Sequence, residues 1–286
     1  MLPKGARIAV VSPSGISDSG RLEAGLVQLR AWGFLPELLP GARAQHRYLA
    51  GNDETRIADL RQAFSGEFAA VWMARGGYGL SRLLDLIDWD TLAPVPFFGF
   101  SDGTALLNAL ACRGRPALHA PVLHALAAHN DEASRLHLLT LLTGKTEIEL
   151  AGESLIPGEA HGRLVGGNLC VLASLCGTRF QLDAGGSIVL LEEVGEAAYK
   201  VDRLLVQLRD SGALSGATGI VLGDFLDTRV PEGADWGLDD VFRDVLGPLG
   251  IPVLKGLPVG HGPTNLAVPL GVPAHLVNDR LRVSTR

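Results

Sequence analysis

Hydrophobic and polar residues follow two alternating patterns through the first half of the chain. Short apolar runs at residues 7–11, 34–39, 69–74 and 95–98 are typical of buried strands. Between them, residues 21–32, 53–64, 80–87 and 104–112 carry apolar side chains at helical spacing. This alternation predicts an α/β fold in which a parallel sheet has helices on both faces.

The second half mixes strands and helices less regularly. Residues 187–191 and 219–225 are apolar runs typical of buried strands, and residues 198–210 predict a helix between them. From residue 251 onward the chain has short strand-like pieces around proline and glycine. A break at Pro157-Gly158 indicates a boundary. We therefore expect an N-terminal α/β domain over residues 1–150 and a smaller mixed α/β domain over residues 160–286.

The pentapeptide Gly99-Phe100-Ser101-Asp102-Gly103 lies where a predicted strand meets the following helix. In that context Gly-x-Ser-x-Gly can form a nucleophile elbow, because the glycines permit a sharp turn that projects the serine hydroxyl. The N-terminus of the helix then offers N–H groups to an oxyanion. The same five residues also occur in ordinary glycine-rich turns, so the motif alone leaves catalysis and a simple turn open.

A second glycine-rich loop, Arg75-Gly76-Gly77-Tyr78-Gly79, follows the strand predicted at residues 69–74. It lacks the lysine of a phosphate-binding Walker loop and the glycine spacing of a dinucleotide-binding loop. Because ligands of parallel sheets gather at the carboxyl ends of the strands, we expect it beside Ser101, where a backbone N–H could complete an oxyanion hole. Arg75 could hold a substrate carboxylate or form a structural ion pair, and the loop could simply be a tight turn.

A serine nucleophile needs a general base and an acid that orients the base. His261 is framed by glycines in a loop after a strand, a position from which an imidazole can reach a site, and His119 could also line the site. The stretches around His124, His129 and His137 are typical of a solvated surface.

Two glutamates are candidates for the orienting acid. Glu192 ends an apolar strand, where a carboxylate is costly unless it has a partner. Glu193 would point to the opposite side of the same strand. The chain order Ser, Glu, His matches that of α/β hydrolases, which is a weak pointer by itself.

Composition narrows the possible functions. The net charge of −6 argues against a nucleic-acid or anionic membrane partner. No apolar run is long enough to span a bilayer, and the N-terminus lacks a signal-peptide pattern, so we expect a cytoplasmic protein. The 3 cysteines have no metal-ligand spacing, and we expect them to be small buried residues in a reducing compartment.

Several motifs, taken together and in order, carry a resemblance to a known family. They are Ile8-Ala9-Val10-Val11-Ser12-Pro13-Ser14, Tyr48-Leu49-Ala50-Gly51-Asn52-Asp53-Glu54, Ala74-Arg75-Gly76-Gly77-Tyr78-Gly79, Gly99-Phe100-Ser101-Asp102, Gly166-Gly167-Asn168-Leu169, Leu191-Glu192-Glu193, Tyr199-Lys200-Val201-Asp202-Arg203 and Pro258-Val259-Gly260-His261-Gly262. Nearly end to end, the chain resembles the LD-carboxypeptidases, serine peptidases that include murein tetrapeptide LD-carboxypeptidase. A sister branch, the microcin immunity peptidases, is also similar.

The resemblance implies a catalytic triad of Ser101, Glu192 and His261, in a site between an N-terminal α/β domain and a smaller C-terminal domain. It implies release of D-alanine from cytoplasmic murein tetrapeptides in peptidoglycan recycling by a homodimer, without a metal or other cofactor. The oxyanion donors would be the N–H of Asp102 and one from the loop at Gly76 and Gly77.

Two arginines are candidates for binding substrate carboxylates. Arg75 and Arg203 would supply fixed positive charge in a chain that is acidic overall. The chain departs from the family pattern at Lys200, where many relatives have arginine, and at Ala120, where we expect glycine. Neither position belongs to the implied triad.

Three other functions stay open. A microcin-immunity-type peptidase would cleave peptidyl-nucleotide antibiotics, although residues 224–249 are short for the inserted aromatic-rich loop of that branch. An esterase-type hydrolase would cleave simple esters, but an acid and base in a separate C-terminal half argue against that fold. A non-enzymatic binding protein would hold a small ligand without turnover.

Overall fold

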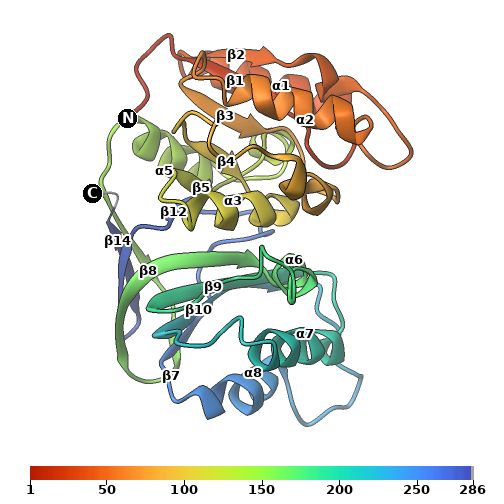
Figure 1. The fold of residues 1–286 in the computed structure, drawn as a ribbon. Coiled ribbons are helices and arrows are strands. Elements are labelled where there is room, and N and C mark those ends of the chain that lie inside the picture. The colour runs from red at the N-terminus through yellow and green to blue at the C-terminus, as the bar shows by residue number, and fades with distance from the viewer. Residues whose placement is uncertain (285–286) are drawn as a thin grey trace. The chain divides into compact units, whose positions relative to one another are not determined.

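The computed structural model describes residues 1–284, and the chain forms two compact units (Figure 1). The first contains Met1–Lys145, and the second begins at Thr146. The three residues Asn265–Ala267 return to the first unit, a crossing that the sequence pattern does not indicate. The predicted α/β fold class is confirmed.

The first unit contains a parallel sheet, as the alternating pattern predicts. Its strands are β1 (Arg7–Val11), β2 (Leu35–Leu38), β3 (Ala70–Met73), β4 (Phe97–Gly99) and β5 (Ala117–His119). Parallel pairings place them in the order β5-β4-β3-β1-β2. The carboxyl ends of β1, β3 and β4 are therefore neighbours at one edge of the sheet.

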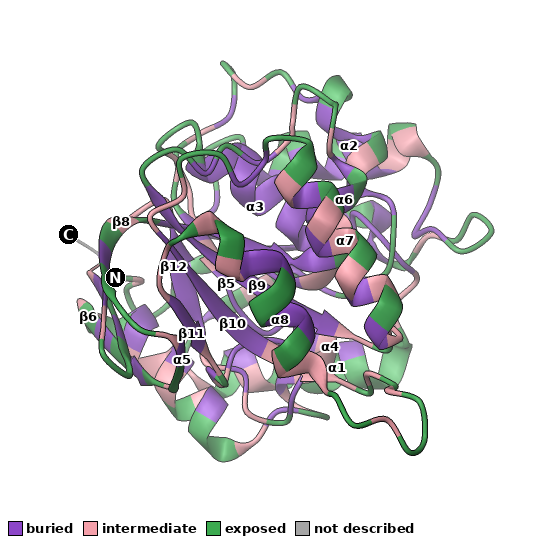
Figure 2. Ribbon diagram, turned by 90° about the horizontal axis from the view of Figure 1, so that it is seen from below, coloured by how far each residue is buried: buried purple, intermediate pink, exposed green. Residues whose placement is uncertain are grey.

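Helices connect these strands and cover both faces of the sheet. They are α1 (Ser19–Ala31), α2 (Asp53–Ala63), α3 (Thr104–Ala111), α4 (Leu123–Leu126) and α5 (Glu132–Thr143), with a 3-10 turn η1 (Pro40–Arg43) after β2. With right-handed crossovers, the strand order places α1 on one face and α2 and α3 on the other. In Figure 2, α2 and α3 lie on the side opposite α1 and α4. Asp18, Asn52 and Asp131 cap the N-termini of α1, α2 and α5 with side-chain oxygens.

The prediction of a helix over residues 80–87 is wrong. The structure has two 3-10 turns there, η2 (Leu80–Arg82) and η3 (Leu84–Leu86). Leu80, Leu83 and Leu84 are all buried, which explains the helical spacing of the apolar positions. The N–H of Leu80 donates a hydrogen bond to the side-chain carboxylate of Asp102, in another loop, and this tertiary contact holds the start of the segment.

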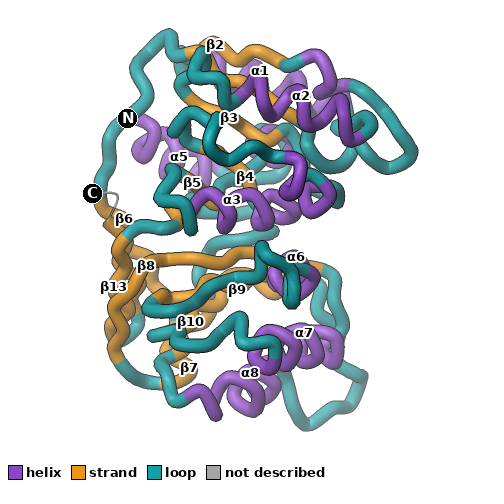
Figure 3. The backbone as a smooth tube through the Cα atoms, viewed as in Figure 1, coloured by secondary structure: helices purple, strands orange, loops and turns teal. Residues whose placement is uncertain are grey.

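The second unit contains a larger mixed sheet (Figure 3). Its strands are β6 (Glu147–Ala151), β7 (Glu153–Ile156), β8 (Glu159–Asn168), β9 (Ser187–Val194), β10 (Gly219–Leu226), β11 (Val253–Lys255), β13 (Pro273–Val277) and β14 (Arg280–Ser284). A short strand β12 (Val268–Leu270) precedes β13. The order is β6-β14-β13-β8-β9-β10-β11-β7, with β8, β9, β10 and β11 parallel to one another.

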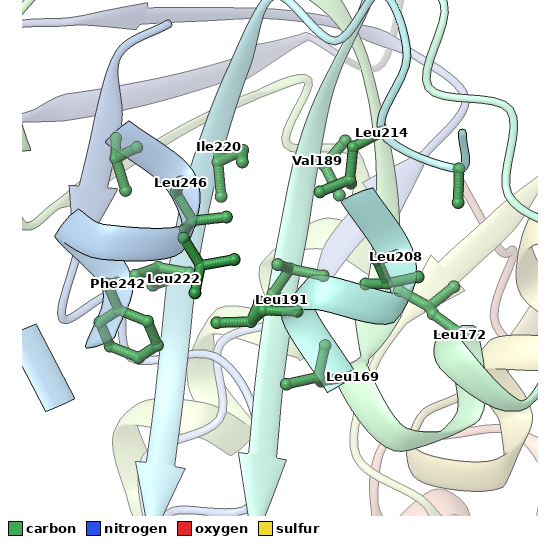
Figure 4. Close-up of a cluster of buried hydrophobic side chains, with 14 of the residues drawn as sticks. Leu169, Leu172, Val189, Leu191, Leu208, Leu214, Ile220, Leu222, Phe242 and Leu246 are labelled. Atoms are coloured by element: carbon green, nitrogen blue, oxygen red, sulfur yellow. The ribbon is translucent and has the colours of Figure 1, made fainter. Parts of the chain in front are cut away.

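Helices α6 (Leu169–Ser174), α7 (Ala198–Asp210) and α8 (Leu238–Leu246) bury one face of this sheet, and a 3-10 turn η5 (Gly247–Leu249) follows α8. Figure 4 shows the resulting core. Leu191 on β9 and Leu222 on β10 face Leu208 of α7 and Phe242 of α8. This apolar layer holds the two central strands rigidly, and their carboxyl ends carry the acidic residues described below.

Two expectations about individual side chains are wrong. Cys112 and Cys170 are exposed and Cys176 is half-buried. Cys170 lies on the outward face of α6, whereas Cys112 and Cys176 follow the last residues of α3 and α6, where the chain leaves the core. His124 and His137 are half-buried instead of solvated, and Nε2 of His137 lies 2.8 Å from the carbonyl oxygen of Ala267. Among residues 1–284, no helix combines the length and the apolar character that crossing a membrane requires.

Candidate active site

Ser101 lies at a sharp junction between a strand and a helix. Strand β4 ends at Gly99, a single 3-10 turn η4 (Ser101–Gly103) follows, and α3 begins at Thr104. The φ angle of Ser101 is 59°, a left-handed conformation that is rare for residues other than glycine. Such a conformation costs about 1–3 kcal/mol and persists only where the surroundings enforce it.

The carboxylate of Asp102 joins three loops at the carboxyl edge of the sheet. Its Oδ2 accepts a hydrogen bond from the hydroxyl of Ser14, after β1, and one of 2.9 Å from the N–H of Leu80, after β3. Asp102 itself follows β4 and is only 3% exposed. Burial raises the pKa of Asp102, and the two hydrogen bonds partly counter that rise. This side chain therefore fixes the turn that presents Ser101.

Glycine at position 76 lets a neighbouring loop approach the serine closely. A Cβ atom at Gly76 would lie 2.9 Å from the Oγ of Ser101, closer than real Cβ atoms come. The carbonyl oxygen of Gly76 accepts a 3.0 Å hydrogen bond from the N–H of Gly15. Gly77 has a φ of +111°, and a Cβ there would lie 3.2 Å from the Cα of Gly15. The first unit thus brings Ser101, Asp102, Gly76 and the Gly15 loop together.

Two arginines donate hydrogen bonds to main-chain carbonyl oxygens of these loops. Arg56 on α2 is buried, and its Nη1 donates to the carbonyl oxygen of Gly79 at 3.0 Å and to that of Pro13. The sequence analysis missed this role, although an arginine on the apolar face of a predicted helix is a usable signal. Arg75 is exposed and donates to the carbonyl oxygen of Ile16.

The second unit pairs the predicted acid with the predicted base. Oε2 of Glu192 lies 2.7 Å from Nδ1 of His261, and Glu192 is 0% exposed near the carboxyl end of β9. Burial by itself lowers the pKa of His261, but the hydrogen bond and the charge of Glu192 outweigh it and raise the pKa above its ordinary value. This arrangement fixes the orientation of the imidazole ring.

Asp224 is a third acidic residue beside this pair, and the sequence analysis missed it. It lies on β10 where the pairing with β9 is irregular, and its Oδ2 accepts a 2.9 Å hydrogen bond from the N–H of Gly262. Burial raises the pKa of Asp224, the Gly262 bond lowers it, and the charge of Glu192 raises it further. An aspartate at the carboxyl end of an apolar strand is the signal that could have found it.

Glycine is also required in the loop that carries the histidine. Gly260 has a φ of +138°, and a Cβ there would lie 2.9 Å from Oε2 of Glu192 and 3.2 Å from the Cβ of Asp224. The loop can therefore pass close to both carboxylates only without a side chain at this position.

Glu193 and Arg203 lie in different surroundings from this pair. Glu193 accepts a 2.8 Å hydrogen bond from the N–H of Cys170 and one of 3.2 Å from Nδ2 of Asn168, so it supports the start of α6. Arg203 is exposed on α7, with its guanidinium carbon 6.0 Å from the ring centre of Tyr199. His119 is buried at the end of β5, with its ring 5.7 Å from that of Phe100.

Comparison with known families gives matches to both units. The family model for the LD-carboxypeptidase N-terminal domain matches residues 8–120, and that for the LD-carboxypeptidase C-terminal domain matches residues 161–276. The murein tetrapeptide carboxypeptidase of Pseudomonas aeruginosa is 38% identical over 98% of this chain and 96% of its own length.

Solved structures agree with these matches. The crystal structure of muramoyltetrapeptide carboxypeptidase from Oxalobacter formigenes has a TM-score of 0.89 at 28% identity, and the match covers 97% of this chain and 98% of that one. The protein MccF in complex with glutamyl sulfamoyl guanosine also has a TM-score of 0.89, covering 100% of this chain and 97% of that one. Its identity is 21%, so that likeness shows the fold alone.

Proposed function

Because this chain belongs to the LD-carboxypeptidase family, we propose that it is a serine-type LD-carboxypeptidase that releases the terminal D-alanine of murein tetrapeptides. The names of the similar proteins from Pseudomonas aeruginosa and Oxalobacter formigenes support this substrate class. Recycling of peptidoglycan in the cytoplasm, by a homodimer, is the setting that we propose for the reaction.

The proposed reaction is acyl transfer through Ser101. Nε2 of His261 takes the hydroxyl proton while Oγ attacks the carbonyl carbon on the L side of the scissile bond. The protonated imidazole then gives that proton to the departing amine of D-alanine, which leaves an acyl-enzyme. Water, deprotonated by the same imidazole, releases the acyl group and restores the serine. Glu192 holds the tautomer of His261 and stabilises its charged form.

The backbone conformation of Ser101 is the observation that carries this proposal. A φ of 59° at the junction of β4 and α3 is the strained turn of a nucleophile elbow. In a simple turn, Gly99 or Gly103 could take the left-handed conformation at no steric cost, so serine would not need to adopt it. The close approach of Gly76 to Oγ supports the same role.

Backbone donors beside the serine would stabilise the oxyanion. We assign this role to the N–H groups of Asp102 and Gly77. The carboxylate ends of the substrate would be held by Arg75 and Arg203, with the main chain of Gly76 against the peptide. A guanidinium matches a carboxylate with two parallel hydrogen bonds, which suits a peptidase that recognises a free C-terminus.

The decisive experiment follows release of D-alanine from a murein tetrapeptide by mass spectrometry. We expect release by the wild-type protein and a loss of about 10⁴-fold or more in Ser101→Ala, because the covalent step disappears. Ser19→Ala, an exposed serine at the start of α1, is the matched control and should keep full activity.

Other outcomes separate the alternatives. Near-normal turnover by Ser101→Ala would reject the serine mechanism. If neither protein releases D-alanine but the wild type cleaves a nucleotide-linked peptide, the activity is that of an immunity peptidase. If no peptide is cleaved and Ser101 does not react with a fluorophosphonate, the chain binds its ligand without turnover.

A further inference from the structure

Three side chains with metal-ligand atoms meet on one face of the sheet in the second unit. Glu159 and His161 lie on β8, and His275 lies on the adjacent antiparallel strand β13 (Figure 3). His161 and His275 are directly opposite each other in the register, and Glu159 is opposite Val277. Residues two apart on a strand, and residues opposite across a pair, share a face, so all three side chains project from the same side.

The ligand atoms already converge. Nε2 of His275 is 2.7 Å from Oε1 of Glu159, and Nε2 of His161 is 3.4 Å from the same oxygen. The two rings are stacked, with centres 3.9 Å apart. One ligand atom from each residue lies within 4.8 Å of the others. Tetrahedral zinc bonds of about 2.0–2.2 Å hold ligand atoms roughly 3.3–3.6 Å apart, so small side-chain rotations would give that spacing.

The cluster itself carries one carboxylate and two imidazoles. The carboxylate of Glu159 provides the negative charge, and the Nε2 atoms of both imidazoles already lie close to its Oε1. Arg282 on β14 lies opposite His275, but its guanidinium is engaged by Glu149 at 2.8 Å. Two stacked imidazoles would repel each other if both were protonated. A divalent ion can instead bind both neutral rings and share the one carboxylate.

We propose that Glu159, His161 and His275 form a binding site for a divalent transition metal such as Zn²⁺, with water completing the coordination. Two imidazoles and a carboxylate are ligands that zinc accepts, and three protein ligands leave an open position. The side chains of His161 and Glu159 are 70% and 58% exposed, so the ion would exchange readily and a chelator would remove it. It would link β8 to β13 without taking part in the peptidase reaction.

Calorimetric titration of the chelator-treated full-length protein with Zn²⁺ tests this site. We expect a single saturable binding event that is lost in both His161→Ala and His275→Ala. Glu159→Gln keeps the size of the side chain and should weaken binding at least about tenfold. Loss of a residue that only hydrogen-bonds to a metal ligand already costs about that much, and Glu159 would bind the metal directly. His129→Ala, an exposed histidine on another part of the chain, is the matched control and should bind as the wild type does.

A second measurement does not depend on the folding of any variant. In the unmutated protein, Zn²⁺ should shift the ring-proton NMR resonances of His161 and His275 and leave that of His129 unchanged. Unshifted resonances at both histidines would overturn the proposal, as would unchanged binding in the His161→Ala/His275→Ala double variant, which would assign the ion to the exposed cysteines or elsewhere. Failure here would leave the carboxypeptidase proposal untouched, since the two share no residue.

Discussion

Around Ser101 the close contacts come largely from the main chain, whereas around His261 they come from carboxylates. Gly76 brings backbone within reach of Ser101, Gly15 lies against Gly76, and the serine itself takes a strained φ. In the second unit, the carboxylate of Glu192 contacts Nδ1 of His261, and the carboxylate of Asp224 accepts a hydrogen bond from the N–H of Gly262. The position of the proposed nucleophile therefore depends on close packing of the main chain, and that of the proposed base depends on charged partners. Different substitutions should damage each.

Removing the charge of Glu192 should produce the largest effect among the substitutions that keep the serine and histidine of the proposed triad. Glu192→Gln has nearly the same size but no longer fixes the tautomer of His261, and we expect kcat/KM to fall about 10³–10⁴-fold. Because this carboxylate raises the pKa of His261, its loss should also move the acid limb of the pH profile to lower pH.

Steady-state kinetics across pH measures both effects of Glu192→Gln. The matched control for the rate is Glu193→Gln, because Glu193 holds the start of α6 and should leave turnover near normal. Its charge also contributes to the raised pKa of His261, so its acid limb should move to lower pH, but by less than in Glu192→Gln. Equal losses in the two variants would show that burial of charge on β9, and not orientation of the base, sets the rate.

Crowding the main chain beside the serine should give the next largest effect. The Cβ of Gly76→Ala would lie 2.9 Å from Oγ and 3.0 Å from Cβ of Ser101, so either the loop or the serine must move. A displacement of about 1 Å at the reacting atom can cost roughly 10²-fold, and we expect that loss mainly in kcat.

The control for this substitution is another glycine without steric neighbours. Gly247→Ala adds a Cβ where no atom lies within 4 Å, and Gly247 has an ordinary φ of −54°. It should leave kcat and KM unchanged. If Gly76→Ala is as active as Gly247→Ala, the close approach at Ser101 has no part in positioning it.

Local apolar pattern explains which elements could be predicted from the sequence. The bounds of β1 and α7 agree with the predicted ranges 7–11 and 198–210, since each is an uninterrupted apolar run or a clear amphipathic face. The motif around Ser101 could be found because its glycines and its place between strand and helix are both local features. The prediction of a helix at 80–87 was wrong because the spacing of apolar residues shows which side chains are buried, and two successive 3-10 turns can bury the same positions.

The partners of the side chains that support the site could not be predicted, because those partners are remote in sequence. Ser14 pairs with Asp102, and Asp224 pairs with Gly262, each through a contact made only in the folded sheet. The local pattern shows that a polar residue lies in an apolar stretch, but it does not show which remote group that residue contacts. Such residues become interpretable only when the order of the parallel strands is known.

Neutralising Asp224 should have a smaller effect than neutralising Glu192. In Asp224→Asn the amide oxygen can still accept the hydrogen bond from Gly262, so we expect kcat/KM within a few-fold of wild type. The charge of Asp224 contributes to the raised pKa of His261, so the acid limb should shift to lower pH, but by less than in Glu192→Gln. Asp227→Asn, an exposed aspartate nearby in sequence, should not move the limb.

The smallest effect on rate, and a measurable one on stability, should come from Ser14→Ala. Its hydroxyl is a partner of the buried Asp102 carboxylate, and loss of one such partner costs about 1–3 kcal/mol of unfolding free energy. Because the folded-state pKa of Asp102 is raised, the folded protein holds this proton more tightly than the unfolded chain does. Ionised Asp102 therefore costs stability as pH rises through that pKa, and the cost disappears as pH falls.

Urea unfolding of Ser14→Ala at neutral and acidic pH tests this sign. The hydroxyl stabilises the ionised carboxylate, so its removal should destabilise the protein more at neutral pH than at acidic pH, with Ser19→Ala unchanged at both. A loss of equal size at the two pH values would mean that Ser14 contributes packing alone. In that case the N–H of Leu80, and not the hydroxyl of Ser14, is the partner through which the Asp102 carboxylate holds the turn that presents Ser101.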